Sequence, residues 1–179
     1  YVRAYATNDV GTAYGNEVSF TTLSIPTIVT TTPVNLTNNS VDAGGDITSD
    51  GGTTVLFSGV CWGTANNPDT TGNHTTDGSV SGAFTSPLTG LNPGTIYYVR
   101  AYVSTSEGTY YGDNLTFTTY SVPYMGTFGA TGITTNTASC DGEIQNDGGS
   151  PVTVSGVCWS TNLNPTLSDP HTVDGLLTG

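Results

Sequence analysis

The chain repeats itself at a distance of 97 residues, and this period limits its fold more than any other feature of the sequence. Residues 1–5 (Tyr-Val-Arg-Ala-Tyr) recur as residues 98–102, and residues 59–62 (Gly-Val-Cys-Trp) recur as residues 156–159. The overlap needs no gap, and 36 of its 82 residue pairs are identical. A fixed period of this kind is typical of domains arranged in tandem.

The composition indicates strands and turns. Gly, Thr, Ser and Asn dominate the chain, and β-branched and aromatic residues alternate between them. We find no convincing helical periodicity in any stretch of the sequence. Because the period matches a β-sandwich of about 100 residues, we predict an all-β chain of tandem seven-stranded β-sandwiches.

The period divides the chain into three parts. We expect the C-terminal strands (F and G) of a preceding repeat in residues 1–22, a complete repeat in 23–119, and strands A to C′ of the next repeat in 120–179. Within the complete repeat we expect strand C′ at 74–77 and one continuous strand G at 109–118. The linkers that precede Pro26 and Pro123 are short and lack a Gly/Ser run, so neighbouring repeats should be stiffly arranged.

Two full periods would need 15 more residues, equivalent to residues 83–97, which carry strand E and the turn before strand F. Without them, the apolar faces of the third part would be open. Either the same chain continues, or a neighbouring subunit supplies strands F and G through its own residues 1–22, which would build an open fibre. Continuation is favoured, because exchange would still lack strand E.

Charge excludes several classes of partner. The formal net charge is −12, with Arg3 and Arg100 as the two basic residues and no lysine. Nucleic-acid binding depends on Lys and Arg, so we expect no nucleic-acid partner and no attraction to an anionic membrane surface. No apolar run approaches the roughly 18 residues of a membrane span, so we expect no membrane insertion in this segment.

The stretch from Leu91 through Pro93 and Thr95 to Tyr97 runs directly into an alternating strand. It resembles the corner between strands E and F of a fibronectin type III domain, in which a tyrosine hydroxyl hydrogen-bonds back to the loop backbone. The resemblance implies this corner role for Tyr97.

Four longer segments extend the resemblance over essentially the whole chain: residues 11–22, 90–102, 156–166 and 172–175. They are similar to the fibronectin type III-like, immunoglobulin-like repeats of Bacteroidetes surface and secreted proteins. The resemblance implies long extracellular adhesins, stalks or filaments, or spacer modules of polysaccharide-degrading enzymes, in which the repeats are generally not catalytic. The loop that contains Gly63 to Ala65, Pro68 and Asp69 departs from the pattern.

The sequence gives little indication of a catalytic or metal-binding site. His74 and His171 occupy one repeated position in different domains, and no nucleophile elbow, zinc-protease or phosphate-loop motif is present. We therefore expect no catalytic residue and no cofactor. Asn67, Asp69 and Asp77 are weak calcium candidates, since calcium needs six to eight oxygen ligands and no EF-hand spacing is present.

The sequence leaves open whether Cys140 and Cys158 form a disulfide. Cys140 and Cys158 lie at similar distances from the turn at Asp147, so they could meet across the sandwich, as suits an oxidising extracellular setting. Against this pairing, Cys158 faces outward if Val157 faces the core.

The outward row Tyr98, Arg100 and Tyr102 recurs as residues 1, 3 and 5. It is either a cross-strand ladder with the arginine stacked between aromatic rings, which we favour, or a contact face for a glycan or a neighbouring filament strand. Separately, residues 69–71 (Asp-Thr-Thr) resemble an O-glycosylation motif of Bacteroidetes secreted proteins, which points to Thr70.

Together these observations predict a non-catalytic structural repeat region of a long extracellular bacterial surface protein, such as an adhesin stalk or a fibre. The alternative is a spacer or carbohydrate-binding accessory module of a secreted polysaccharide-degrading enzyme. The expected partners are neighbouring repeats, with lateral or head-to-tail self-association and a glycan or cell-surface partner as further candidates.

Overall fold

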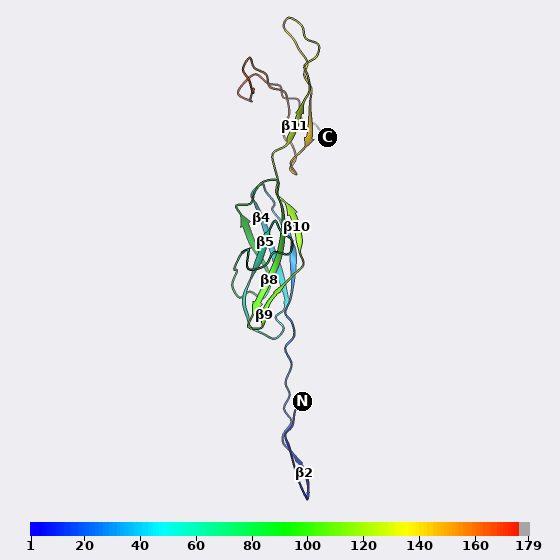
Figure 1. Ribbon diagram of the computed structural model, residues 1–179, viewed down its shortest axis with the longest axis vertical. Coiled ribbons are helices and arrows are strands. Elements are labelled where there is room, and N and C mark those ends of the chain that lie inside the picture. The colour runs from blue at the N-terminus through cyan, green and yellow to red at the C-terminus, as the bar shows by residue number, and fades with distance from the viewer. Residues whose placement is uncertain (176–179) are drawn as a thin grey trace.

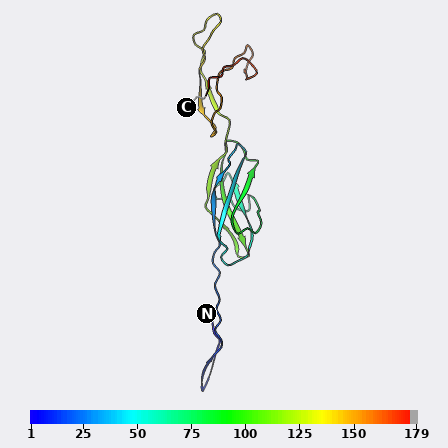
Figure 2. The same ribbon diagram turned by 180° about the vertical axis from the view of Figure 1, so that it is seen from behind.

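The fold is seen in a computed structural model that describes residues 1–175. The end of the expected third part, residues 176–179, lies outside the described residues. A β-sandwich occupies the middle of an elongated molecule, with a β-hairpin at either end (Figures 1 and 2). Every regular element of the described residues is a β-strand, which confirms the predicted all-β class.

The first sheet of the central sandwich is antiparallel and has the order β3–β4–β7. Its strands are β3 (Thr27–Val34), β4 (Ser40–Ser49) and β7 (Gly82–Thr89). On the middle strand β4, the inward residues Val41, Ala43 and Ile47 alternate with more exposed ones. This alternation is what a strand with one buried face requires.

The second sheet has the order β10–β8–β5–β6, and β9 also pairs with β8. Its strands are β5 (Val55–Gly63), β6 (Asn73–His74), β8 (Ile96–Thr105), β9 (Gly108–Tyr111) and β10 (Leu115–Thr118). The long strand β8 is the centre of this sheet, since it pairs with β5 on one side and with β9 and β10 on the other.

The core fills the space between the two sheets. It combines aliphatic side chains from both sheets with two stacked aromatic rings, Tyr97 and Phe117, whose centroids lie 5.5 Å apart. Burial of a large apolar side chain stabilises a fold by about 1.5–3 kcal/mol, so burial of this cluster stabilises the sandwich. Its members are Val41, Ala43, Val60, Leu88, Leu91, Tyr97, Val99 and Phe117.

The expected single strand G is divided into β9 and β10, so that prediction was wrong in detail. The cause is a side chain from the other sheet. The hydroxyl oxygen of Thr30 on β3 accepts the backbone N–H of Ala101 at 3.0 Å, beside Gly112. The ladder between β8 and strand G is interrupted at this point, although Gly112 N–H still donates to Ala101 O at 2.9 Å.

The expected strand C′ at 74–77 was also only partly right, because β6 ends at His74. Beyond it the chain still follows β5, but the side chain of Thr75 replaces its backbone carbonyl: Val60 N–H donates to Thr75 Oγ1 at 3.0 Å. The Thr75 carbonyl instead turns over the outer face of the sheet, where it accepts the Tyr102 hydroxyl at 2.7 Å.

The N-terminal segment, residues 1–22, forms the hairpin of β1 (Tyr5–Asn8) and β2 (Gly11–Tyr14). Its register matches that of β8 and β9 at the 97-residue shift, because Tyr5 pairs with Tyr14 as Tyr102 pairs with Tyr111. Its apolar side chains lack the cover that their equivalents have: Val2 is 53 % exposed, whereas Val99 is 0 % exposed.

The C-terminal segment, residues 120–175, forms the hairpin of β11 (Tyr124–Thr127) and β12 (Gly142–Asn146). The strand C expected here is absent from the described residues, and the stretch carries only an isolated bridge between Cys158 and His171. In the central sandwich the equivalent strand, β5, pairs with β8 along most of its length. The described part of this segment has no counterpart of β8, which explains the missing ladder.

Candidate functional site

The corner before β8 has the geometry that its sequence implied. The backbone N–H of Asn92 donates to the Tyr97 hydroxyl at 3.0 Å, and Tyr97 is 7 % exposed. Thr119, just after β10, locks the same corner, because its hydroxyl accepts from Thr95 N–H at 3.0 Å and donates to Asn92 O at 2.6 Å. The corner is thus tied to the end of the sandwich, next to the linker that leaves it.

The linker is hydrogen-bonded on both sides. Tyr120 N–H donates to Thr37 O at 3.0 Å, and Tyr120 O accepts from Gly94 N–H at 3.1 Å, so this residue belongs to the central sandwich. The next residue, Ser121, donates its N–H to Gly148 O at 2.8 Å in the C-terminal segment. No flexible residue separates the two attachments, which makes this linker a junction rather than a tether.

The same contact is built at the other end of the sandwich. Ser24 N–H donates to Gly51 O at 2.9 Å, which is the equivalent pair at the 97-residue shift. Both glycines have positive φ, 70° at Gly51 and 75° at Gly148. A Cβ at either position would lie 2.1 Å from the carbonyl oxygen of the facing linker serine, so glycine is needed for the linker to approach.

The outer face of the second sheet differs from the expected contact face. Tyr98 and Arg100 are partly exposed, but Tyr102 is only 3 % exposed. The segment after β6 covers the Tyr102 ring, and its approach requires Gly59, where a Cβ would lie 2.3 Å from Thr75 O. Tyr102 therefore cannot serve as an open contact residue in this arrangement.

Arg100 stacks on an aromatic ring that the sequence analysis did not identify. Its guanidinium carbon lies 4.5 Å from the ring centroid of Tyr111 on β9, and its Nε donates to Gly112 O at 3.2 Å. In the N-terminal segment, Arg3 lies over Tyr14 at 4.9 Å in the same way. In both segments the arginine thus stacks on a tyrosine of the neighbouring strand.

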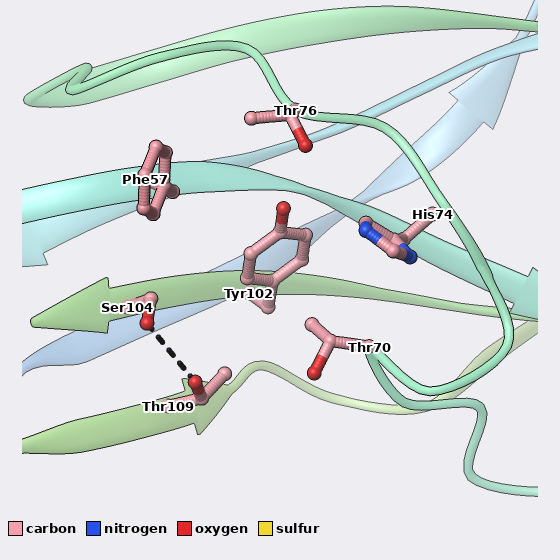
Figure 3. A pocket seen from close by; sticks show the side chains of 7 residues that line it. All are labelled: Phe57, Thr70, His74, Thr76, Tyr102, Ser104 and Thr109. Atoms are coloured by element: carbon pink, nitrogen blue, oxygen red, sulfur yellow. Dashed lines mark hydrogen bonds between the residues drawn. The ribbon is translucent and has the colours of Figure 1, made fainter.

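A hollow of about 290 Å³ opens on this outer face beside Tyr102 (Figure 3). We call it the outer-face hollow. Phe57 of β5 and Ser104 of β8 lie opposite each other in the sheet register, and Ser104 hydrogen-bonds to Thr109 of β9 at 3.1 Å. The lining residues are Phe57, Thr70, His74, Thr76, Tyr102, Ser104 and Thr109.

Besides Tyr102, two residues singled out from the sequence, His74 and Thr70, lie in this hollow. His74 has its ring edge-on to Tyr102, with centroids 6.2 Å apart, and its Nδ1 lies 3.0 Å from Gly72 O. Thr70, the O-glycosylation candidate, hydrogen-bonds through its hydroxyl to the Tyr111 hydroxyl at 3.2 Å. A sugar attached at Thr70 would have to displace this hydrogen bond.

Each calcium candidate makes hydrogen bonds within the protein, and the backbone N–H of Asn67 donates to Asn114 Oδ1 at 3.3 Å. Asp69 accepts from the N–H and the hydroxyl of Thr71, whose hydrogen bonds lower the pKa of the Asp69 carboxyl. Asp77 accepts from the hydroxyls of Thr75 and Ser86. Among residues 1–175, no three His, Cys, Asp or Glu side chains form a group that could hold a metal ion.

The cysteine thiols are free, so the structure differs from the Cys140–Cys158 disulfide that the sequence left open. The sulfur of Cys140 lies 3.3 Å from Phe128 O, whereas that of Cys158 lies 3.4 Å from Pro165 O. In the central sandwich the equivalent cysteine, Cys61, lies on the outer face of β5, opposite Arg100 of β8. There the covering loop buries Cys61, and burial raises the pKa of its thiol to about 12.

Sequence reasoning identified His74 and the aromatic row but missed the hollow and the junction contacts. The hollow combines residues from four strands (β5, β6, β8 and β9) and from the loops on either side of β6, which are far apart in the sequence. The sequence did contain a signal for the junction, because Asp-Gly-Gly recurs at 50–52 and 147–149. In the structure both glycines of each copy have positive φ. This signal indicated a turn but not its contact with the linker.

No protein-family model and no curated protein matches the chain. Among solved structures, a sensor domain of the anti-sigma factor RsgI4 from Pseudobacteroides cellulosolvens is 18 % identical, with a TM-score of 0.42, over 55 % of this chain and 97 % of that one. A myokine structure is 18 % identical with a TM-score of 0.40, over 55 % and 98 % of the two chains. A solution structure of the RsgI4 sensor domain is 15 % identical with a TM-score of 0.39, over 53 % and 75 %. At these identities and TM-scores, the similarities do not indicate a function for this chain.

Within the described residues, no helix has the length and apolar character to cross a membrane.

Proposed function

We propose that this chain is part of a stiff tandem array of fibronectin type III-like sandwiches with a non-catalytic, structural role on an extracellular bacterial surface, as in an adhesin stalk or fibre. The observation that carries the proposal is the linker at Tyr120 and Ser121, which is hydrogen-bonded to the sandwich before it and to the turn after it. Two backbone hydrogen bonds hold Tyr120 to the sandwich, and a third, which contributes about 1 kcal/mol, ties Ser121 to the turn of the next segment and opposes bending.

Local geometry supports the division into repeats. Several hydrogen bonds recur at the 97-residue shift with similar lengths, such as Ser58 Oγ to Gly78 O at 3.0 Å and Ser155 Oγ to Gly175 O at 2.7 Å. The end segments also expose side chains whose equivalents form the core: Phe20 is 67 % exposed, whereas Phe117 is 9 % exposed. Both features fit residues 1–22 and 120–175 as parts of further repeats.

The alternative is a spacer or carbohydrate-binding module of a secreted polysaccharide-degrading enzyme. One observation favours it, namely the outer-face hollow with its half-exposed Phe57. The two functions predict different domains next to these repeats. The sequence of the whole gene therefore discriminates between them.

Sequencing the gene on both sides of the encoded segment tests the proposal. Many further 97-residue repeats, together with a secretion or surface-attachment region, are the expected result. A glycoside hydrolase domain beside only two or three repeats would overturn the structural role in favour of the accessory module.

A further inference from the structure

We propose that the outer-face hollow binds a single neutral pyranose ring of a glycan. This activity goes beyond the structural role, since the junction contacts lie at the ends of the sandwich and the hollow lies on the outer face of β5, β8 and β9. Four features of the hollow carry the proposal: an exposed aromatic ring, a hydroxyl-rich wall, a lining without fixed charge, and its size.

The aromatic ring is that of Phe57, which is 51 % exposed at the edge of the hollow (Figure 3). A single exposed apolar residue is ordinary on a protein surface. This residue, however, lies on a strand opposite Ser104, so its ring stands beside the polar groups that line the hollow. An aromatic face offers apolar contact to the C–H groups of a sugar ring while the sugar hydroxyls remain free to hydrogen-bond.

The polar groups match sugar hydroxyls. Thr70, Thr76 and Thr109 carry hydroxyls, each of which can both donate and accept. The Nδ1 atom of His74 faces the carbonyl of Gly72, which only accepts, so Nδ1 carries a proton and Nε2 is the ring nitrogen left for a ligand.

The wall is already fixed before any ligand arrives. The Tyr102 hydroxyl is anchored to Thr75 O at 2.7 Å, and Ser104 is anchored to Thr109 at 3.1 Å. These side chains therefore have little freedom left to lose when a ligand binds, which favours affinity.

Charge and size select the ligand. Among the described residues that line the hollow, none is Lys, Arg, Asp or Glu, and the net charge of −12 disfavours an anionic sugar. The volume of about 290 Å³ lies just below the range of drug-sized ligand pockets, about 300–1,000 Å³. One ring at the end or at a branch of a glycan fits these limits better than a long oligosaccharide does.

The hollow is specific to the complete sandwich. At the 97-residue shift, Phe57, Thr70 and Thr76 correspond to Val154, Leu167 and Val173. The aromatic ring and two of the hydroxyls are therefore not common to both repeats. The apolar residues at the equivalent positions show which substitutions to use in a test.

The test is an NMR titration of the ¹⁵N-labelled 179-residue chain with methyl β-D-glucopyranoside, methyl β-D-galactopyranoside and methyl α-D-mannopyranoside. We expect saturable shifts of the Phe57, His74 and Ser104 amides with at least one of the three. The triple variant Phe57→Val/Thr70→Leu/Thr76→Val should weaken this binding about tenfold or more, the loss expected when an aromatic contact and hydroxyl partners are removed together.

Phe20→Val is the matched control, because it makes one of the same changes at a phenylalanine that is also exposed but lies outside the hollow. It should leave the titration unchanged. If the triple variant does not fold, Phe57→Val alone takes its place. The proposal is overturned if none of the probes gives saturable shifts at its highest soluble concentration, if the shifts lie outside the hollow, if Phe20→Val weakens binding equally, or if glucuronic acid binds more tightly than the neutral sugars.

Discussion

At the scale of single residues, the Tyr97 hydroxyl is the partner of the Asn92 backbone N–H in a corner that is otherwise closed by Thr119. Tyr97→Phe keeps the ring that stacks on Phe117 but removes the acceptor. We expect the free energy of unfolding to fall by about 1 kcal/mol, the usual contribution of such a hydrogen bond.

Urea unfolding of residues 23–119 would measure this loss. The control is Tyr98→Phe, since the Tyr98 hydroxyl makes no hydrogen bond within the described residues. Equal unfolding midpoints for wild type and Tyr97→Phe would show that the corner does not depend on this hydroxyl.

Cys61 gives a second prediction at this scale. The loop after β5 buries it, and burial raises the pKa of its thiol to about 12. Because the thiolate is the reactive form, folded residues 23–119, with Cys61 as their only cysteine, should resist a thiol reagent at pH 8. The thiol should react at once after unfolding in guanidinium, and its reaction in the folded state should accelerate as the pH rises toward 12. Rapid labelling of the folded protein at pH 8 would contradict the burial of this side chain.

At the scale of elements, the segment after β6 is held against β5 at Gly59. A Cβ at this position would lie 2.3 Å from Thr75 O, so Gly59→Ala must displace the segment or the strand. We expect a loss of about 1–3 kcal/mol in the free energy of unfolding, as is typical when a packed site is overfilled.

The matched control is Gly63→Ala on the same strand, where the nearest atom to an added Cβ lies 4.0 Å away. Chemical denaturation of both variants measures the difference. If Gly63→Ala proved as costly as Gly59→Ala, the loss would come from the strand backbone rather than from the close approach of Thr75.

The strands of the central sandwich were largely predictable from alternation and turn residues, because both signals are local. The sequence predicts strands at 40–48, 54–62, 82–88 and 95–104, and β4, β5, β7 and β8 fall within one residue of these limits. The break between β9 and β10 was not predictable, since it depends on Thr30, which lies 71 residues from its partner Ala101. The burial of Tyr102 was not predictable for the same reason. The segment that covers it contains Thr75, which is distant from Tyr102 in the sequence.

At the scale of the whole molecule, the junction depends on Gly51 and its equivalent Gly148. Gly51→Ala in every unit of a tandem polypeptide should release the linker, because the added Cβ would meet Ser24 O at 2.1 Å. Small-angle X-ray scattering should then report a smaller maximum dimension and a broader distribution of shapes than in the wild type.

Gly78→Ala is the control for backbone strain, since Gly78 also has positive φ, 84°, but has no atom within 4 Å of an added Cβ. It should leave the maximum dimension unchanged. An equal effect of both substitutions would assign the change to strain inside the sandwich and not to the junction.

Scattering from two, three and four directly joined copies of residues 23–119 measures the stiffness of the array itself. If each linker is held on both sides, as Tyr120 and Ser121 are, the maximum dimension should increase by the same amount with every added copy. Growth close to the square root of the number of copies, as for a flexible chain, would contradict a stiff structural array.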